Sequence, residues 1–211
     1  MIVKRLLLFV LAVSLLTIFT VYWKYSSQTN LQFMIAVERG DTNTVQALLK
    51  KGVNANTKNR WGSSALTQAV YLGRTKVVEL LVANGANINV PIDKNITVLT
   101  LAAGKGYADI VKILLDNGAK IDNNSFHAAV SSGNELIVQE LLDKGADINS
   151  IGRLHMSALM YAAQFGRTNV VKYLLAKGAD VNLKVNGETA LIIAKKNKHP
   201  DIVKLLQQAG G

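Results

Sequence analysis

The sequence predicts an all-α repeat solenoid of six units that follows one transmembrane helix. Three observations predict this fold class: an uncharged run of 18 residues near the N-terminus, glycines that recur at steps of 33 residues, and one apolar pattern before each of these glycines. A repeat of this length is typical of solenoids, whose single units contain too little core to fold alone.

The first segment of the chain has the composition of a membrane helix. Residues 1–5 are basic, residues 6–23 carry no charge, and this run ends in aromatic residues that favour the membrane interface. As a helix the uncharged run would span about 27 Å, close to the hydrocarbon thickness of a bilayer. We therefore predict an uncleaved signal anchor over residues 6–23, followed by a linker over residues 24–30.

The orientation of this anchor is set by basic residues on its two sides. Lys4 and Arg5 precede the span and Lys24 and Arg39 follow it, so the positive-inside bias is slight. The export-signal character of the first five residues favours a single-pass inner-membrane protein with its repeats in the periplasm. Two alternatives stay open: a cleaved signal that releases a periplasmic protein, and repeats in the cytoplasm.

The repeats are marked by glycines that each end a helical segment. A valine lies seven residues before each glycine and a leucine four residues before it, so these side chains share one face of a helix. The six glycines are Gly52, Gly85, Gly118, Gly145, Gly178 and Gly210. A second helix precedes each of the helices that end at these glycines. In four units its start is marked by a hydroxyl side chain that can accept a hydrogen bond from a backbone N–H. These hydroxyl residues are Ser64, Thr97, Ser157 and Thr189.

The repeat pattern defines one domain over residues 31–211. Its predicted units cover about residues 31–58, 59–91, 92–122, 123–149, 150–182 and 183–211. In the last unit Gln207 replaces the third apolar residue, which suits a polar cap that faces water.

One interval between the glycines measures 27 residues instead of 33. Ten residues separate Asn89 from Leu99, whereas four separate the equivalent Asp122 from Phe126. Because the apolar positions of the fourth unit stay in register, we predict that its hairpin is missing and its core is kept. The deletion is either a tolerated loop variation or a notch that admits a protruding part of a partner.

These motifs resemble those of ankyrin repeats over residues 31–211. The resemblance rests on the Val-x-x-Leu-Leu segments and on Gly-Ala-Asp-x-Asn turns such as GADINS and GADVNL. The chain departs from the family pattern at the first helix of each unit, where proline is absent and only His127 matches the family's histidine. The resemblance implies stacked helix pairs whose connecting loops project as a row of β-hairpins.

Composition and motif spacing argue against catalysis and metal binding. The chain has no cysteine, and His127, His155 and His199 lie in different units without metal-ligand spacing. The glycines end helices and do not form a phosphate-binding loop. We predict no catalytic residue, no metal, no cofactor and no small-molecule substrate, with His127 in a structural role.

The net charge is +10, of which three charges belong to the first 25 residues. The remaining basic side chains are scattered between units, which argues against nucleic acid as a partner. Attraction to anionic lipid or to an acidic protein and an ordinary solvated surface both remain open.

The resemblance implies a concave surface, made of hairpin tips and the exposed ends of the first helices, that binds another protein. Mapped onto this sequence, the candidate contact residues are Arg39, Lys58, Arg60, Trp61, Tyr71, Leu72, Lys94, Lys105, Arg153, Leu154, Met156, Gln164 and Phe165. Large aromatic side chains carry much of the binding energy of protein interfaces. For Trp61, packing across adjacent hairpins is an open alternative.

We therefore predict that the chain is a non-catalytic module that is tethered to the membrane through residues 6–23 and captures a partner protein. The chain resembles small exported bacterial ankyrin proteins, some of which are immunity proteins against a secreted toxin such as a lipase. That resemblance implies steric occlusion of a toxin's active site, with Arg60, Trp61, Tyr71, Arg153 and Phe165 as anchors. The alternative function is a membrane-associated scaffold or adaptor that organises an envelope or cytoplasmic complex.

Overall fold

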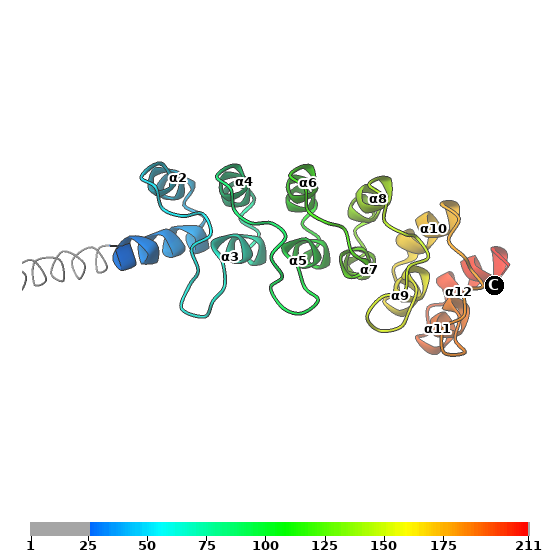
Figure 1. Ribbon diagram of the computed structural model, residues 1–211. Helices are drawn as coiled ribbons and strands as arrows, with labels where there is room; N and C mark the ends of the chain where they lie inside the picture. The colour runs from blue at the N-terminus through cyan, green and yellow to red at the C-terminus, as the bar shows by residue number, and fades with distance from the viewer. Residues whose placement is uncertain (1–25, 211) are drawn as a thin grey trace, which may run out of the picture.

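The computed structural model describes residues 26–210, which form two layers of short helices (Figure 1). Residues 26–39 form the first helix. It is followed by α2 (Thr42–Lys50), α3 (Ala65–Tyr71), α4 (Thr75–Ala83), α5 (Val98–Lys105), α6 (Ala108–Asp116), α7 (Asn123–Ser132), α8 (Glu135–Asp143), α9 (Ala158–Gln164), α10 (Thr168–Ala176), α11 (Ala190–Lys196) and α12 (Pro200–Gln208).

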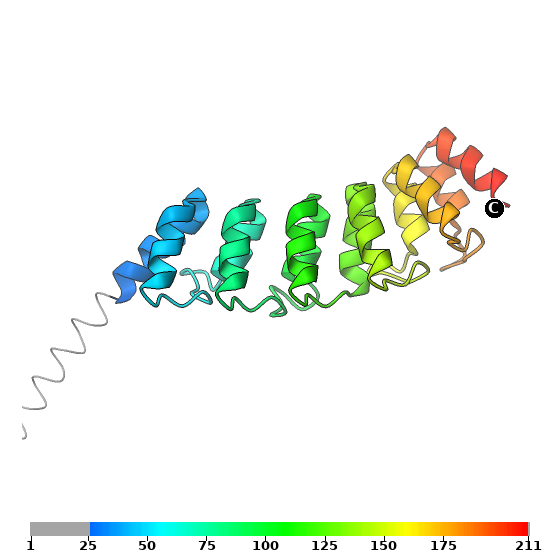
Figure 2. The same cartoon turned by 90° about the horizontal axis from the view of Figure 1, so that it is seen from above.

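The helices alternate between an inner and an outer layer. The inner layer contains the helix over residues 26–39 with α3, α5, α7, α9 and α11, and the outer layer contains the even-numbered helices (Figure 1). From α3 onward each helix contacts its partner in the other layer, and from α2 onward successive helices of one layer contact each other. Figure 2 shows the resulting pairs side by side along one axis. The structure is therefore an all-helical solenoid, and the count of six units stays a prediction.

The N-terminal part of the chain differs from the sequence prediction in one respect. Residues 26–30, which we expected in a linker, are already helical. The predicted anchor over residues 6–23 lies outside the described residues. Between residues 26 and 210, no helix has the length and apolar character needed to span a bilayer.

The repeated valines and leucines of the outer helices form the core. The leucines at Leu81, Leu114, Leu141, Leu174 and Leu206 are fully buried. In the shortened fourth unit, Phe126 and Val138 are at most 1% exposed. The shortening therefore leaves the core of that unit intact, as its sequence register predicts.

The inner helices begin at the predicted hydroxyl residues. Ser64, Thr97 and Ser157 each accept a hydrogen bond from the backbone N–H three residues further on, at 3.1, 3.1 and 3.3 Å. Thr189 does the same for Ile192 N. Such capping satisfies a donor that has no partner inside the helix.

The connections before the inner helices are tight turns. In residues 26–210 no β-strand forms, and the expected hairpins are reduced to single antiparallel bridges. These bridges are Lys58–Ser64, Asp93–Ile96, Ile151–Ser157 and Val185–Glu188. Between α6 and α7 the turn is missing, because Asp122 caps α7 directly. The predicted loss of the hairpin before the fourth unit is confirmed.

Asparagine side chains join the turns of successive units. Asn89 Nδ2 donates to Gly118 O at 2.9 Å and Asn89 Oδ1 accepts from Lys120 N at 2.9 Å. Asn56 makes the same two bonds one unit earlier, to Gly85 O and Asn87 N. We call this row of bonds the asparagine ladder, and it fixes the spacing of neighbouring units.

The contribution of the core can be measured on α8. Leu141→Ala removes a side chain with 0% exposure, so we expect a loss of about 3 kcal/mol in the free energy of unfolding. Leu136→Ala on the same helix, where the side chain is 69% exposed, serves as the control and should change stability by less than about 0.5 kcal/mol. Chemical denaturation followed by circular dichroism measures both, and equal losses would contradict this assignment of the core.

Candidate functional site

The exposed apolar side chains that the sequence singled out belong to the inner helices, to the residues that follow them or to the turns beside them. We call the face that is made of the inner helices and the turns that precede them the inner face (Figure 1). Trp61, Leu154, Tyr71 and Phe165 on this face are 71, 54, 53 and 43% exposed. The other predicted contact residues lie there too, and Met156 and Gln164 are half-buried. Exposed aromatic and apolar side chains are enriched where a surface contacts a partner protein.

Trp61 stands on a turn that is held by hydrogen bonds. Asn59 Oδ1 accepts from Trp61 N and from Ser63 N, both at 3.0 Å. Gly62 supplies the positive φ of 80° that the turn needs. The Arg60 guanidinium lies 4.1 Å from the centroid of the Trp61 ring. The indole is thus positioned by its backbone while most of its surface remains open to solvent.

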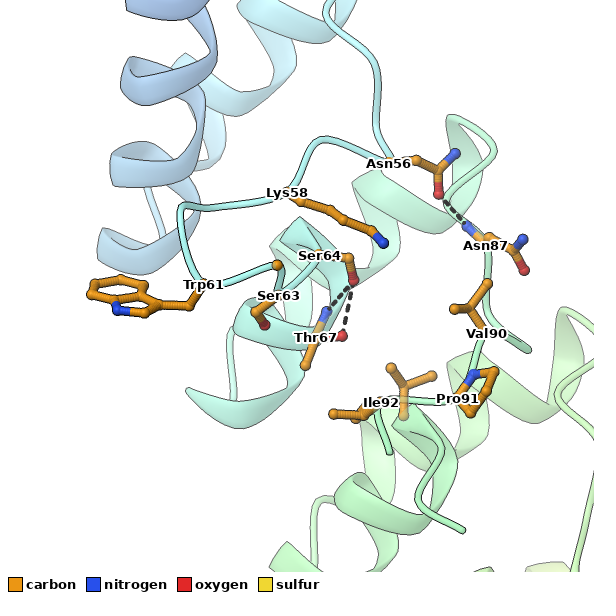
Figure 3. Close-up of a pocket in the computed structure, with 12 residues that line it drawn as sticks. Asn56, Lys58, Trp61, Ser63, Ser64, Thr67, Asn87, Val90, Pro91 and Ile92 are labelled. Atoms are coloured by element: carbon orange, nitrogen blue, oxygen red, sulfur yellow. Dashed lines mark hydrogen bonds between the residues drawn. The ribbon is translucent and has the colours of Figure 1, made fainter. Parts of the chain in front are cut away.

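A cavity of about 330 Å³ separates this turn from the next one (Figure 3). Lys58 and Trp61 line it from one turn, and Val90, Pro91 and Ile92 line it from the other. A pocket with an apolar wall and one cation suits an apolar side chain that lies close to a carboxylate. Sequence reasoning missed these three consecutive apolar residues, although such a run is unusual in a turn.

Aromatic rings also mark the ends of two inner helices. Lys105 Nζ, at the end of α5, lies 4.5 Å from the ring centroid of Tyr71 in the neighbouring unit. Phe165 follows α9, and its ring centroid lies 6.2 Å from that of Tyr161. An exposed cation–π pair contributes about 0.5–1 kcal/mol, which holds Lys105 near Tyr71 while leaving both available to a partner.

The charges of the inner face are mostly unpaired. In the described part of the chain, three ion pairs join Asp116 or Glu140 to lysines on the outer helices, and the fourth joins Lys196 to Glu188. The Lys144 ammonium beside Asp116 holds the pKa of that carboxyl below its usual value. On the inner face, no ion pair with a described residue engages Lys58, Arg60, Lys94, Lys105 or Arg153. The face therefore carries a basic excess that attracts acidic surfaces.

His127 has a structural role inside the inner layer. Its side chain is 3% exposed, and its Nε2 lies 3.1 Å from Ser150 O. Its ring lies 4.8 Å from that of Tyr161, and a Cβ on Gly152 would lie 2.8 Å from the imidazole. Burial lowers the pKa of His127 below its usual 6.5, against the opposing effect of the backbone carbonyls.

The described residues do not form a metal centre. Across residues 26–210, no group of three His, Asp or Glu side chains is arranged to hold a metal ion. The arrangement offers a surface with two exposed cation–aromatic pairs and an open cavity, and such a surface can bind a partner.

The stacked helices define an all-helical repeat solenoid. A family model described as "Ankyrin repeats (3 copies)" matches residues 33–125 and 126–211. The chain belongs to the ankyrin repeat family. Ankyrin repeat domains are non-catalytic protein–protein interaction modules.

Solved structures support the same fold. The human ASB11 ankyrin repeat domain is 27% identical with a TM-score of 0.78, over 85% of this chain and 83% of that one. The ankyrin repeat domain of Bcl-3, a member of the IkappaB protein family, is 27% identical with a TM-score of 0.74, over 85% of this chain and 86% of that one. A sequence comparison with curated proteins gives no match.

The buried imidazole makes stability depend on pH. Because the folded state disfavours protonated His127, the unfolded chain binds more protons as the pH falls below about 6.5, and the stability present above that pH is lost. We expect the free energy of unfolding to fall by at most about 1.4 kcal/mol per pH unit there. Denaturation at several pH values between 7 and 5 measures it. His127→Gln should flatten this part of the profile, and an unchanged slope would contradict the assignment.

Proposed function

We propose that the chain is a membrane-tethered module that captures one partner protein on its inner face. The observation that carries this proposal is that Trp61, Tyr71, Leu154 and Phe165 are all exposed on the inner helices and their turns. Arg60 and Lys105 lie against two of these rings without a carboxylate partner among the described residues. Interface hot spots are enriched in Trp, Tyr and Arg. A face that holds these groups in fixed positions loses little conformational entropy on binding.

We further propose that capture inhibits the partner by covering its active site. The exported ankyrin proteins that the sequence resembles include immunity proteins, so the proposed partner is a secreted toxin such as a lipase. The supporting feature of this chain is the length of the inner face, which runs along residues 26–210 (Figure 2). Contacts from several units can cover a wide area of a partner, and this suits occlusion better than recognition of a short peptide.

The proposed location follows from residues 1–25. We propose that residues 6–23 anchor the chain in the inner membrane and that the repeats lie in the periplasm. A toxin that arrives from outside the cell would meet its inhibitor in that compartment. The basic side chains of the inner face also attract anionic lipid. Lipid and the protein partner would then compete for the same surface.

The binding face can be tested by affinity capture with the intact protein followed by calorimetry with the captured partner. Trp61→Ala and Phe165→Ala each remove a large exposed aromatic side chain, so we expect the dissociation constant to rise about 30-fold for either variant. Leu136→Ala on α8 is the matched control, because that side chain is 69% exposed but lies in the outer layer. Unchanged affinity with both aromatic variants would remove the inner face from consideration.

The proposed anchor and orientation can be tested in cells. A reporter enzyme that is active only outside the cytoplasm, fused after Gly211, should be active with the full chain. The protein should also stay with membranes at alkaline pH, whereas Leu15→Arg combined with Leu16→Arg places charges at the centre of the run and should release it. Activity of a cytoplasmic reporter at the same position would reverse the orientation.

A further inference from the structure

The inner face has a gap in its row of turns at the fourth unit. Turns project before α3, α5 and α9, and none projects before α7 (Figure 1). The site of the missing turn is a cavity of about 250 Å³, which we call the notch. Its lining includes Ile96 from one neighbouring turn, Arg153 and Leu154 from the other, and Asn124, Ala128 and Ser131 from α7.

Small side chains of α7, Ala128 and Ser131, form the bottom of the notch and leave its volume open. Ser131 lies two residues before the glycine that ends α7, and Gly104 lies at the same position in α5. The second unit has Tyr71 at this position, where the side chain is 53% exposed. A large ring thus occupies this position in the second unit, whereas the notch has the small side chain of Ser131 there.

The walls of the notch are held in place from its floor. The missing turn is replaced by an additional N-terminal segment of α7, whose Asn124 Nδ2 donates to Asn95 O at 3.2 Å in one wall. Asn123 Nδ2 donates to Ile151 O at 3.3 Å in the other wall. Leu154 N donates to the Tyr161 hydroxyl at 3.3 Å. Both flanking turns are therefore fixed to helices, and the opening is preformed.

Arg153 is the cation that lines the notch. It is exposed and forms no ion pair with a described residue, and Lys94 is exposed on the turn that provides the opposite wall. The two nearby carboxylates are engaged by the backbone: Asp93 accepts from Lys94 N and Asp122 accepts from Ser125 N, both at 2.6 Å. Asp93 offsets the charge of the adjacent Lys94, and the Arg153 guanidinium is the cation left to recognise an external carboxylate.

We propose that the notch receives an acidic loop of the partner protein, with an apolar side chain against Ile96 and Leu154 and a carboxylate against Arg153. The Arg153 guanidinium selects this occupant, since it lines the notch without an ion pair and can bind a carboxylate that lies next to an apolar residue. The proposal rests on the proposed protein-binding function and adds the chemistry of the segment that is recognised.

The direct test uses the full chain in a zwitterionic detergent and a dye-labelled peptide Asp-Glu-Leu-Glu-Asp, with Lys-Arg-Leu-Arg-Lys as the charge-reversed peptide. Fluorescence anisotropy should show binding of the acidic peptide alone, and the affinity should fall as ionic strength rises. Ser131→Tyr fills the notch with the residue that the second unit already tolerates, and Arg153→Glu reverses the charge of one wall. Each should weaken binding at least about tenfold.

The control is Lys172→Glu, which makes the same charge change at an exposed position of the outer helix α10 and should weaken binding less than about threefold. An equal loss in this control, binding of the basic peptide, or unchanged binding after Ser131→Tyr would overturn the proposal. If Ser131→Tyr lowers the melting temperature, Arg153→Glu on its exposed turn decides the result.

The proposal about the notch and the proposal about the inner face can be tested separately. A captured partner whose affinity falls with Trp61→Ala but not with Ser131→Tyr or Arg153→Glu would exclude the notch and keep the inner face. Absence of any captured partner would count against the proposed function, while the peptide measurements would still decide whether the notch binds acidic segments.

Discussion

Burial of apolar surface between neighbouring units is the constraint on which the whole structure depends. A single helix pair such as α7 and α8 is too small to enclose a core, so Phe126, Val138 and Leu141 are buried only because the units on either side cover them. Stability of such a stack is approximately a sum of unit and interface contributions. The core positions are therefore restricted to apolar residues, whereas the inner face is free to carry Trp61, Tyr71 or Phe165.

Polar contacts decide how the units are spaced. The asparagine ladder joins the turns through Asn56 and Asn89, and Asn149 Oδ1 accepts from Asp180 N at 2.9 Å further along the stack. The fourth unit has Asp122 at the ladder position, and its carboxylate caps α7. Asn123 and Asn124 then connect α7 to both neighbouring turns. The spacing is maintained by different residues where the turn is lost, and the result is an opening with fixed walls.

The sequence predicts the parts of this structure that depend on short-range spacing. Offsets of three and four residues locate the buried leucines of α4, α6, α8 and α10, and one hydroxyl residue locates the start of each of four inner helices. The deletion before Phe126 follows from the register of the apolar residues. The bonds of Asn123 and Asn124 join residues 28 and 29 positions apart, and no local pattern predicts them. The wall formed by Val90 and Ile92 was missed because an apolar run in a turn has no helical period.

The short connection between α6 and α7 also bears on how the chain reaches its folded state. Six residues, 117–122, join these helices, and α5 and α7 make the most extensive contact of any two described helices. A shorter connection loses less chain entropy when its ends are brought together, and local contacts form early in helical proteins. We therefore expect folding to nucleate in the middle of the molecule, with order spreading outward to both ends, so that the walls of the notch are assembled before the surfaces that flank them.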